Sequence, residues 1–561
     1  MTVVLLLVGG FSAILLRLLF LHVFEGPALA HRAERQHQRM VTLEGERGKI
    51  YDRRGRELAI NVDVYSLYGD PSRVDNPRGA ARSLASLLAM ETGKLERRLA
   101  GPGNFVWIER RLPPDLVRKV ETLIIPGIGW IPESKRFYPK RELLAPVLGF
   151  SGIDNRGLEG VERGYDSVLK GKTVELVLER DARGRAVFGK TGEEGYRGND
   201  LILTIDEVVQ YLTEQELDRA VQEHQAVRGM AVVMNPWTGE ILAMSVRPGF
   251  NPNFASGYRP EQWRNRIITD VYEPGSTFKI VTAAGVLEEK LLKPGDVVDD
   301  GSGTLVVSGA VIHDSHPAGR PLTLEEVIQH SSNVGAAKMG MMLGGERLDH
   351  YIRAFGFGRK TGVDLPGEVR GLVSDRSRWS GRSLATISIG QEVAVTPIQL
   401  VRAMAAIANG GWLIQPRVVH GVRTPEGEDR LHQPELARRV ISPETARQLG
   451  AILKRVTEKE GTAYLANVPG YEVAGKMGTA QKVDPATGRY SSDQFVSSFV
   501  GYLPADRPEI AVLVVVDSPK GLGWGGSVAA PVFSRIAAQT LRYLHAPGQE
   551  EKIPLVVAKN P

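Results

Sequence analysis

The chain contains no cysteine in its 561 residues. This absence excludes disulfide bonds, thiolate metal sites and cysteine nucleophiles together, although it does not fix the cellular compartment. A basic stripe with interleaved aromatic residues is also missing, so we expect no nucleic-acid partner. The net charge of +5 is small for this length and is compatible with anionic surfaces without establishing them. The remaining composition, 42% hydrophobic and 24% charged, is ordinary for a folded protein of roughly two to four domains.

One long apolar run stands at the N-terminus. Residues 3–24 read VVLLLVGGFSAILLRLLFLHVF, and about 20 such residues can cross a bilayer. The run is long for a signal peptide and nothing basic precedes it, so we expect an uncleaved single-pass anchor, although the ALA at 28–30 has the form of a cleavage site. Arginines follow the run between residues 32 and 39. The positive-inside rule alone therefore places the rest of the chain in the cytoplasm, unless a short basic tail precedes Met1.

The rest of the chain divides into two parts joined by a polar linker. The first part is rich in strand and turn signals, and GKTGEEGYRGND at 189–200 reads as the linker. The second part contains LILTID, the hairpin signature MAVVMNPWTGEILAMS and the apolar runs FVSSFVGYLP and IAVLVVVD, which indicate an α/β domain with antiparallel strands; the polar stretch 422–433 reads as a loop. The expected divisions are an anchor at 1–24, an N-terminal domain at 25–199, a larger domain at 200–545 and a tail at 546–561.

The segment EPGSTFKIVTAAGVLEEK at 273–290 carries the first candidate for nucleophilic chemistry. Its apolar residues run nearly all round a helix, so the helix should be buried. Ser276 and Lys279 lie three apart in its first turn, within reach of each other. Burial and the positive helix end should lower the lysine pKa, and a neutral lysine can take a proton from a serine. The same spacing recurs at Ser167 and Lys170, which we interpret as a solvated helix end.

Two further elements follow along the chain. Ser331-Ser332-Asn333 is its only S-x-N triplet. A serine there could relay a proton and the asparagine amide could hold a substrate amide, whereas the triplet alone would read as a helix cap or turn. The strand-like AGKMGTAQK at 474–482 comes later, with a methionine between its lysine and glycine. Literal Lys-Thr-Gly tripeptides at 190–192 and 360–362 lie in the linker and in a polar turn, so we assign neither to the site.

In this order, S-x-x-K, S-x-N and K-x-G resemble the motifs of the penicillin-recognising serine transpeptidases and β-lactamases. The segments ERGKIYDRRGRELA, RNRIITDVYEPGSTFK, QHSSNVGAAK, SIGQEVAVTPIQL and SVAAPVF narrow the resemblance to the class B penicillin-binding proteins, and to their septal, FtsI-type division enzymes. The resemblance implies a membrane-anchored multidomain protein. Its N-terminal α+β pedestal, or dimerisation-like, domain would precede an α/β penicillin-binding transpeptidase domain with an antiparallel sheet and a helical cluster, as in serine β-lactamases.

The resemblance also implies an activity, that of a serine-type D-Ala-D-Ala transpeptidase. Such an enzyme cross-links peptidoglycan stem peptides during septal cell-wall synthesis and is inhibited by β-lactams. Carried over residue by residue, the resemblance implies Ser276 as the acylated nucleophile, Lys279 as its base, Ser331 and Asn333 for proton transfer and peptide positioning, Lys476 for the proton network, and Ser276, Gly478 and Thr479 for the oxyanion and the substrate carboxylate.

No cofactor or metal is expected. His313, Asp314 and His316 lack a further ligand at a useful spacing, so we interpret them as polar loop residues. The implied partners are stem peptides, β-lactams, an FtsW-type membrane glycan polymerase and other division proteins. The implied location is the inner (cytoplasmic) membrane, with the bulk of the chain on the extracytoplasmic side, in conflict with the charge rule at the anchor.

Other functions stay open as alternatives. An elongation-type or sporulation-type class B transpeptidase would carry the same motifs. A β-lactam-hydrolysing enzyme would need a positioned water and base, and no E-x-x-L-N element follows the S-x-N triplet. A weakly active or silent penicillin-binding scaffold is suggested by Met477, which departs from the K-[ST]-G pattern.

The methionine at 477 raises a specific expectation. Alternate residues of a strand share a face, so Met477 should lie beside Thr479, where a hydroxyl could donate a hydrogen bond to a substrate carboxylate. The alternative is that Met477 turns into the core and has no effect. Because every implied catalytic group lies within 200–545, we also expect that part alone to retain acylation chemistry.

Overall fold

The computed structural model describes residues 1–26, 39–180, 186–188, 197–299, 301–434, 436–484, 487–521 and 523–546. The possible cleavage site, the arginines before residue 39, the tripeptide at 190–192 and the tail beyond residue 546 lie outside these ranges. The chain forms two compact units. One comprises Met1–Gly48 with Ser167–Asn199, and the other comprises Lys49–Asp166 with Asp200–Pro561.

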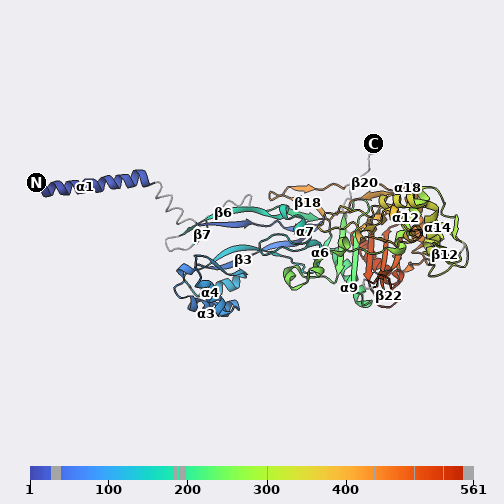
Figure 1. Ribbon diagram of the computed structural model, residues 1–561, viewed down its shortest axis with the longest axis horizontal. Coiled ribbons are helices and arrows are strands. Elements are labelled where there is room, and N and C mark those ends of the chain that lie inside the picture. Colours follow the sequence, from blue (N-terminus) through green and yellow to red (C-terminus); the bar gives the residue numbers. More distant parts are fainter. Residues whose placement is uncertain are drawn as a thin grey trace. The chain divides into compact units, whose positions relative to one another are not determined.

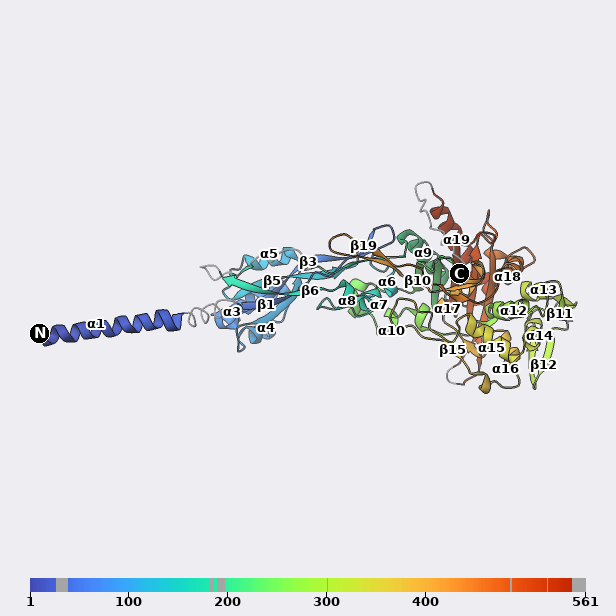
Figure 2. The same cartoon turned by 90° about the horizontal axis from the view of Figure 1, so that it is seen from above.

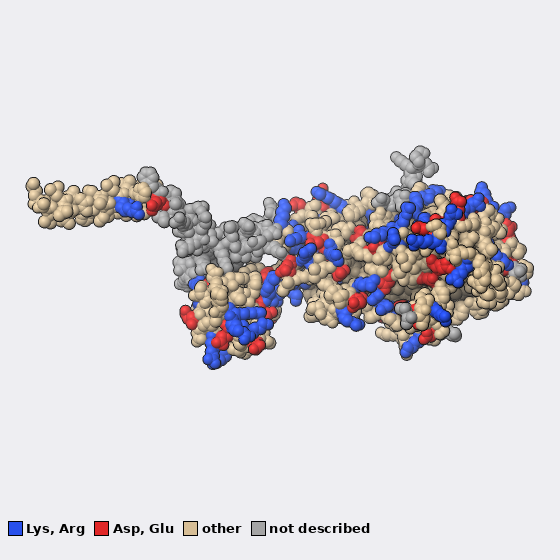
Figure 3. All heavy atoms as spheres, in the orientation of Figure 1, with Lys and Arg blue, Asp and Glu red and all other residues tan. Residues whose placement is uncertain are grey.

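The first unit holds a long apolar helix and a small sheet. The helix α1 (Thr2–Phe20) continues into a π-helical turn, and the apolar stretch Thr2–Val23 is long enough to cross a membrane. No residue of α1 is buried, and its surface in Figure 3 is almost free of charged side chains. The other elements are η1 (Leu21–Glu25) and the antiparallel strands β1 (Arg39–Gly45), β6 (Gly171–Arg180) and β7 (Ala186–Phe188), in the order β1-β6-β7.

The second unit begins with a strand-rich region. Its elements are β2 (Ile50–Tyr51), β3 (Glu57–Gly69), η2 (Pro71–Arg73), α3 (Pro77–Leu88), α4 (Thr92–Leu99), β4 (Val106–Leu112), α5 (Pro114–Glu121), β5 (Ile128–Phe137), α6 (Ala145–Leu148) and α7 (Gly160–Gly164), followed at the unit boundary by α8 (Asp166–Leu169). The long strand β3 pairs with β2, β4 and β5. Apolar residues of β3, β4 and the helices α3, α4 and α5 form one buried core, which includes Leu67, Leu84 and Leu99. This part is therefore α+β, as the resemblance implied.

A five-stranded antiparallel sheet forms the centre of the remaining chain. Its strands are β9 (Arg228–Met234), β10 (Ile241–Arg247), β21 (Ala474–Val483), β22 (Tyr490–Leu503) and β23 (Ile510–Asp517), in the order β10-β9-β23-β22-β21. The predicted hairpin is β9–β10, and the strand that carries Lys476 is β21, at the edge of the sheet. All residues of β23 are buried, because helices cover both faces of the sheet.

Helices flank this sheet on two sides and form a cluster beside it. The covering helices are α9 (Glu207–Glu223) and α19 (Gly525–Leu544) on one face and α17 (Pro397–Ala408) on the other (Figure 2). In Figure 1 the cluster lies to the right of the red strands; its main members are α12 (Lys279–Glu288), α14 (Asn333–Leu343) and α18 (Pro443–Arg455). The residues of α12 from Lys279 to Leu287 are all buried, which confirms the burial predicted from its sequence.

Shorter elements connect these parts. The helical ones are η3 (Pro252–Gly257), α10 (Pro260–Trp263), α11 (Arg266–Thr269), η4 (Gly275–Phe278), α13 (Leu324–Gln329), α15 (Gly345–Ala354), η5 (Arg376–Arg378), α16 (Ser383–Ser388) and η6 (Tyr464–Ala466). The strands are β8 (Asp200–Leu203), β11 (Val297–Asp299), β12 (Thr304–Val307), β13 (Ala310–His313), β14 (Leu322–Thr323), β15 (Leu372–Val373), β16 (Val393–Ala394), β17 (Trp412–Ile414), β18 (Val419–Arg423), β19 (Asp429–Leu431) and β20 (Leu436–Arg439). The stretch 422–433, expected to be a loop, is a turn over 424–428 between the antiparallel strands β18 and β19, so that prediction was wrong for 422–423 and 429–431.

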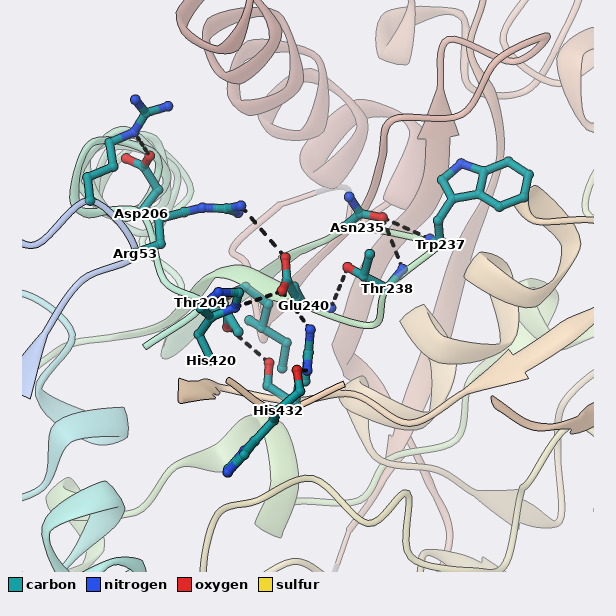
Figure 4. A network of polar contacts seen from close by, with 12 residues as sticks. Arg53, Thr204, Asp206, Asn235, Trp237, Thr238, Glu240, His420 and His432 are labelled. Atoms are coloured by element: carbon teal, nitrogen blue, oxygen red, sulfur yellow. Dashed lines mark hydrogen bonds and ion pairs between the residues drawn. The ribbon is translucent and has the colours of Figure 1, made fainter. Parts of the chain in front are cut away.

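An ion-pair network joins the start of the second unit to the central sheet. Figure 4 shows Glu240 at its centre, with Arg53 and His420 directed toward it. The Glu240 carboxylate lies 2.7 Å from the Arg417 guanidinium, 3.0 Å from His420 Nδ1 and 3.7 Å from the Arg53 guanidinium. Burial works to raise the pKa of Glu240, but the His420 hydrogen bond and the two arginines hold it at about 2. The network stands beside the parallel pairing of β2 with β8.

Candidate active site

A cavity of about 1160 Å³ lies between the edge strand β21 and the helical cluster. Ser276, Ser331, Asn333 and Thr479 all line it. These four residues come from η4, the turn before α14 with the first residue of that helix, and the edge strand, which are far apart in the sequence. The structure therefore brings the three predicted motifs together at one cavity.

Ser276 is positioned by glycines that allow close backbone contact. Gly275 has φ +53°, and a Cβ there would lie 3.2 Å from the carbonyl oxygen of Thr479. A Cβ on Gly390 would lie 2.1 Å from the carbonyl oxygen of Gly275, so only glycine fits there. The 3-10 turn η4 carries Ser276 and leads directly into the buried helix α12. Ser276 consequently stands at the cavity, while the turn that carries it is fixed against β21.

Lys279 is completely buried, and its hydrogen bonds are specific. Its Nζ donates to the carbonyl oxygen of Ser331 at 2.6 Å and to Asn333 Oδ1 at 2.8 Å. Burial lowers the pKa of Lys279 well below its ordinary value, and the neighbouring Lys476 lowers it further, against the opposing effect of Asp314. A neutral amine has two hydrogens and one lone pair. Both hydrogens can serve the two acceptors, which leaves the lone pair available for a hydroxyl proton.

Ser331 lies between the two lysines. Its hydroxyl accepts a hydrogen bond from Lys476 Nζ at 2.8 Å, and Lys279 Nζ lies 3.4 Å from the same oxygen. The backbone of Ser331 is left-handed, with φ +60°, immediately before Ser332 caps α14. This turn allows both the carbonyl and the hydroxyl of Ser331 to face the lysines.

Lys476 is the second fully buried lysine of the site. Burial lowers its pKa to about 7, so its ammonium and amine forms are both accessible near neutral pH. Its strand pairs only with β22, in the register Lys476↔Val500 and Thr479↔Ser497. Because β21 is an edge strand, one row of its backbone groups has no partner within the sheet.

Asp314 holds the S-x-N turn in place. Its carboxylate accepts from the backbone N–H groups of Asn333 and Val334, the latter at 3.0 Å, and from the Ser332 hydroxyl at 2.8 Å. The carbonyl oxygen of His313 accepts from Asn333 Nδ2 at 2.9 Å. The prediction that these are polar loop residues was wrong for His313, which ends β13, and it missed both contacts, because only the fold brings the end of β13 to the start of α14.

Met477 and Thr479 both line the cavity, as the alternation along β21 predicted. Thr479 Oγ1 accepts a hydrogen bond from the backbone N–H of Gly525 at 2.9 Å. Met477 is only 7% exposed. A Cβ added to Gly526 would lie 3.0 Å from the Met477 sulfur, so the thioether rests against the first turn of α19.

The competing motifs that lie within the described residues, at 167–170 and 360–362, are not part of this cavity. Ser167 and Lys170 are both exposed, as expected for a solvated helix end. Thr361, from a literal Lys-Thr-Gly tripeptide, instead donates its hydroxyl to Glu368 at 2.5 Å. Among the residues that the structure describes, no group of three or more histidine, aspartate or glutamate side chains could hold a metal ion.

Comparison with known proteins agrees with this arrangement. Residues 229–538 match the model of the penicillin binding protein transpeptidase domain, and residues 42–203 match that of the penicillin-binding protein dimerisation domain. The chain is 37% identical to Stage V sporulation protein D of Bacillus subtilis over 549 residues, covering 96% of this chain and 84% of that protein. It is 34% identical to peptidoglycan D,D-transpeptidase FtsI of Escherichia coli over 537 residues, covering 94% of this chain and 89% of that protein.

Solved structures resemble the chain along most of its length. A peptidoglycan synthetase from Bifidobacterium adolescentis has a TM-score of 0.73 at 26% identity, covering 92% of this chain and 98% of that one. Penicillin binding protein 3 of Mycobacterium tuberculosis, complexed with aztreonam, has a TM-score of 0.71 at 29% identity, covering 90% and 98%. The chain belongs to the class B penicillin-binding proteins, with a dimerisation domain followed by a serine transpeptidase domain.

Proposed function

We propose that this protein is a peptidoglycan D,D-transpeptidase that cross-links stem peptides through an acyl-enzyme on Ser276. The observation that carries the proposal is the placement of two buried lysines, Lys279 and Lys476, on either side of the Ser331 hydroxyl at a cavity that Ser276 lines. Fully buried lysines with lowered pKa values are uncommon outside functional sites.

In the first step, Ser276 Oγ attacks the carbonyl carbon between the two terminal D-alanines of a stem peptide. Neutral Lys279 takes the hydroxyl proton, since its own two hydrogens are held by Ser331 and Asn333. The amide C–N bond then breaks, and the leaving D-alanine amine receives a proton through the Lys279, Ser331 and Lys476 network. The Ser276 ester that remains is the acyl-enzyme.

In the second step, an amine of a neighbouring stem peptide attacks the ester carbonyl. The network that delivered a proton now removes one from the amine, and the C–O bond to Ser276 breaks. The Ser276 oxygen regains its proton, and the new amide is the cross-link. Ser331 is the exchange point, because its hydroxyl contacts both lysines.

Transition-state stabilisation is assigned to backbone groups. We place the oxyanion between the backbone N–H groups of Ser276 and Thr479. Gly478 allows β21 to lie close to the turn that carries Ser276, because a Cβ on Gly478 would lie 2.8 Å from the carbonyl oxygen of Pro274. The Thr479 hydroxyl is assigned to the substrate carboxylate. Asn333, whose amide is held by Lys279 and His313, is assigned to the peptide amide.

We further propose an anchored protein that acts at the division septum. The apolar helix α1 would be the single-pass anchor in the cytoplasmic membrane, and the catalytic part would lie outside, where peptidoglycan is found. The functional divisions are those expected from the sequence, namely 1–24, 25–199, 200–545 and 546–561.

The septal role follows the resemblance to division enzymes, with an FtsW-type glycan polymerase as partner. Sporulation is the competing role, since one relative carries that name. Complementation of division-defective and sporulation-defective strains separates the two.

The catalytic proposal is tested by labelling the full-length protein with a fluorescent penicillin. The wild type should give a long-lived covalent adduct that Ser276→Ala abolishes. Ser167→Ala, which alters the exposed second S-x-x-K motif, is the matched control and should label normally. Labelling that survives Ser276→Ala would refute the site assignment. An adduct that turns over rapidly would indicate a β-lactamase, and absence of any adduct would indicate a silent scaffold.

A further inference from the structure

We propose that Met477 is a specificity-determining residue that weakens recognition of the carboxylate on the leaving group. The inference rests on the proposed transpeptidase function and deepens it. It concerns the leaving amino acid, the part of the stem peptide that departs when Ser276 is acylated.

The methionine occupies a position from which a hydroxyl would face the cavity. Met477 and Thr479 are alternate residues of β21, and both line the cavity. A thioether has no hydrogen to donate, so Met477 offers only apolar, polarisable surface. Its sulfur rests against the position of Gly526, where any side chain would meet it at 3.0 Å. The space between β21 and α19 is therefore filled, with no hydrogen-bond donor from residue 477.

Thr479 is consequently the single side-chain hydroxyl of β21 that faces the cavity. Its oxygen accepts from the Gly525 N–H at 2.9 Å, so its one proton remains free for a substrate oxygen. The next residue on the same face, Gln481, donates one of its two side-chain amide hydrogens to the carbonyl oxygen of Ser491 at 3.1 Å. The strand thus offers one hydroxyl donor where a hydroxyl at 477 would make two.

The charges of the cavity do not replace the missing donor. Glu273, Asp314 and Asp493 line it, and among the described residues that line it none is lysine or arginine. Lys476 is fully buried behind the surface, where its Nζ donates to Ser331 and to the carbonyl oxygen of Met477 at 3.3 Å. A carboxylate on the leaving group therefore depends on neutral donors, and the loss of one has a large relative effect.

The consequence is weak selection between leaving groups with and without a carboxylate. A hydrogen bond to a charged group changes a rate by about tenfold to a hundredfold when it is formed in the transition state. The oxyanion donors are backbone groups, so acylation itself continues. Penicillins, which carry a carboxylate, should accordingly acylate this enzyme slowly.

The test compares two acyl-D-alanyl thioesters that differ only in the leaving group, thioglycolic acid in one and its methyl ester in the other. The readout is the ratio of kcat/KM for the charged to the neutral substrate, measured on the full-length protein. In Met477→Thr this ratio should rise by about tenfold to a hundredfold over the wild type. Met477→Ser supplies the same hydroxyl on a smaller side chain and should raise the ratio if the threonine variant does not fold.

Three controls separate donation from packing. Met477→Leu keeps an apolar side chain of similar size and should keep the wild-type ratio. Met342→Thr makes the same substitution at an exposed methionine of α14 and should also keep it. Thr479→Ala removes the remaining hydroxyl and should lower the ratio below that of the wild type.

The outcomes distinguish this inference from the proposed function. An unchanged ratio in both hydroxyl variants, with turnover of the neutral thioester preserved, would show that Met477 is packing only. A ratio that persists in Thr479→Ala would also overturn the inference, because another group would then bind the carboxylate. If the wild type neither turns over either thioester nor labels at Ser276, it is the transpeptidase function that fails.

Discussion

At the scale of single residues, the chemistry depends on two buried lysines whose pKa values are lowered and whose hydrogen-bond partners differ. Lys279 Nζ donates hydrogen bonds to two acceptors of the S-x-N turn, whereas Lys476 Nζ donates to the Ser331 hydroxyl and to a backbone carbonyl oxygen. The same burial that lowers both pKa values also makes each lysine sensitive to neighbouring charge. The negative charge of the Asp314 carboxylate opposes this lowering, because it raises the pKa of Lys279.

Replacing Asp314 with asparagine should shift the pH dependence of acylation. The amide oxygen can still accept from the Asn333 and Val334 N–H groups, so the turn is retained. Loss of the negative charge removes the one influence that raises the pKa of Lys279. Since the base must be neutral, the rate rises with pH through its pKa, and the acidic limb of the profile should move to lower pH.

The control for this prediction is Asp493→Asn, which removes an exposed carboxylate from the same cavity. The second-order rate of penicillin acylation is measured for all three proteins between about pH 5 and 9. This range lies below the ordinary lysine pKa, so a lysine that titrates within it has a lowered pKa. If Asp314→Asn lowers the maximum acylation rate but leaves the acidic limb at the same pH, Asp314 only stabilises the turn.

The proposed catalytic residues could be picked out because each motif is local in sequence. Ser276 with Lys279 and Ser331 with Asn333 are close along the chain; hydrogen bonds join Lys279, Ser331, Asn333 and Lys476, and Ser276 lines the same cavity as Ser331 and Asn333. Asp314 was not predictable, because its carboxylate acts on a turn that only the fold brings near. The Met477 side chain is nearly buried and also lines the cavity, so its position alone does not choose between a missing carboxylate donor and a packing role without effect.

At the scale of elements, the site depends on α19 packing directly on the edge strand. Gly525 makes this possible, because a Cβ there would lie 2.3 Å from the carbonyl oxygen of Gly478 and 2.6 Å from that of Ser498. Backbone atoms of two strands cannot move aside as a flexible side chain would. The first turn of α19 therefore sets the width of the cavity beside Thr479.

Gly525→Ala should push α19 away from β21. Overpacking of this kind costs about 1 to 3 kcal/mol of stability, and the Thr479 hydroxyl would lose its contact with the Gly525 N–H. We expect a lower thermal midpoint together with slower acylation. The matched control is Gly257→Ala, at a glycine whose added Cβ would meet nothing within 4 Å. Normal acylation in the Gly525 variant would contradict the claim that this contact shapes the site.

A second prediction at this scale concerns the Glu240 network. Its pKa of about 2 is below its ordinary value of 4.5, so the folded state gains stability above about pH 4.5 and loses that gain as the pH falls toward 2. Glu240→Gln leaves the two arginines and the His420 ring without the carboxylate and should cost about 3 kcal/mol at neutral pH. The difference in thermal midpoint between wild type and variant should shrink as the pH is lowered through this window. If the difference in thermal midpoint between wild type and variant does not change with pH, the loss of stability does not come from the charge of Glu240.

Elements were predicted well where hydrophobic pattern and length agreed. The hairpin β9–β10 and the strands β22 and β23 have nearly continuous apolar cores, which the sequence displays directly. The hairpin β18–β19 was missed because the three residues of β19 are all exposed, so no alternation of apolar and polar residues marks it. Its pairing comes from backbone hydrogen bonds to β18, which a sequence pattern does not reveal.

At the scale of the whole molecule, the functional divisions and the compact units do not coincide. The strand β2, from before residue 200, pairs with β8, and Arg54 Nε lies 2.8 Å from the Asp206 carboxylate. A cut at 200 removes one partner of β8 and the Arg53 contact of Glu240, so we expect 200–545 to be less stable alone than with the preceding strands, and its acylation stays a prediction. Sequence could not reveal this, since the pairing joins segments on opposite sides of the linker.

Two truncations test this point. A protein that lacks only residues 1–26 should be acylated by penicillin about as fast as the full-length protein, because every proposed catalytic group is kept. The fragment 200–545 should be markedly less stable than the fragment 46–545, which retains β2 and the two arginines. Equal thermal midpoints for the two fragments would show that the N-terminal strands contribute nothing to the catalytic part.

The most direct test of the account is to locate the covalent intermediate and follow its fate. The full-length protein is incubated with a D-Ala-D-Ala stem peptide, with and without an acceptor amine, and analysed by peptide-mapping mass spectrometry. We predict a stem-peptide ester on Ser276 that has lost the terminal D-alanine, and its conversion to a cross-linked amide when the amine is added. An ester on any other residue, or an amide product formed equally well by Ser276→Ala, would contradict the proposed mechanism.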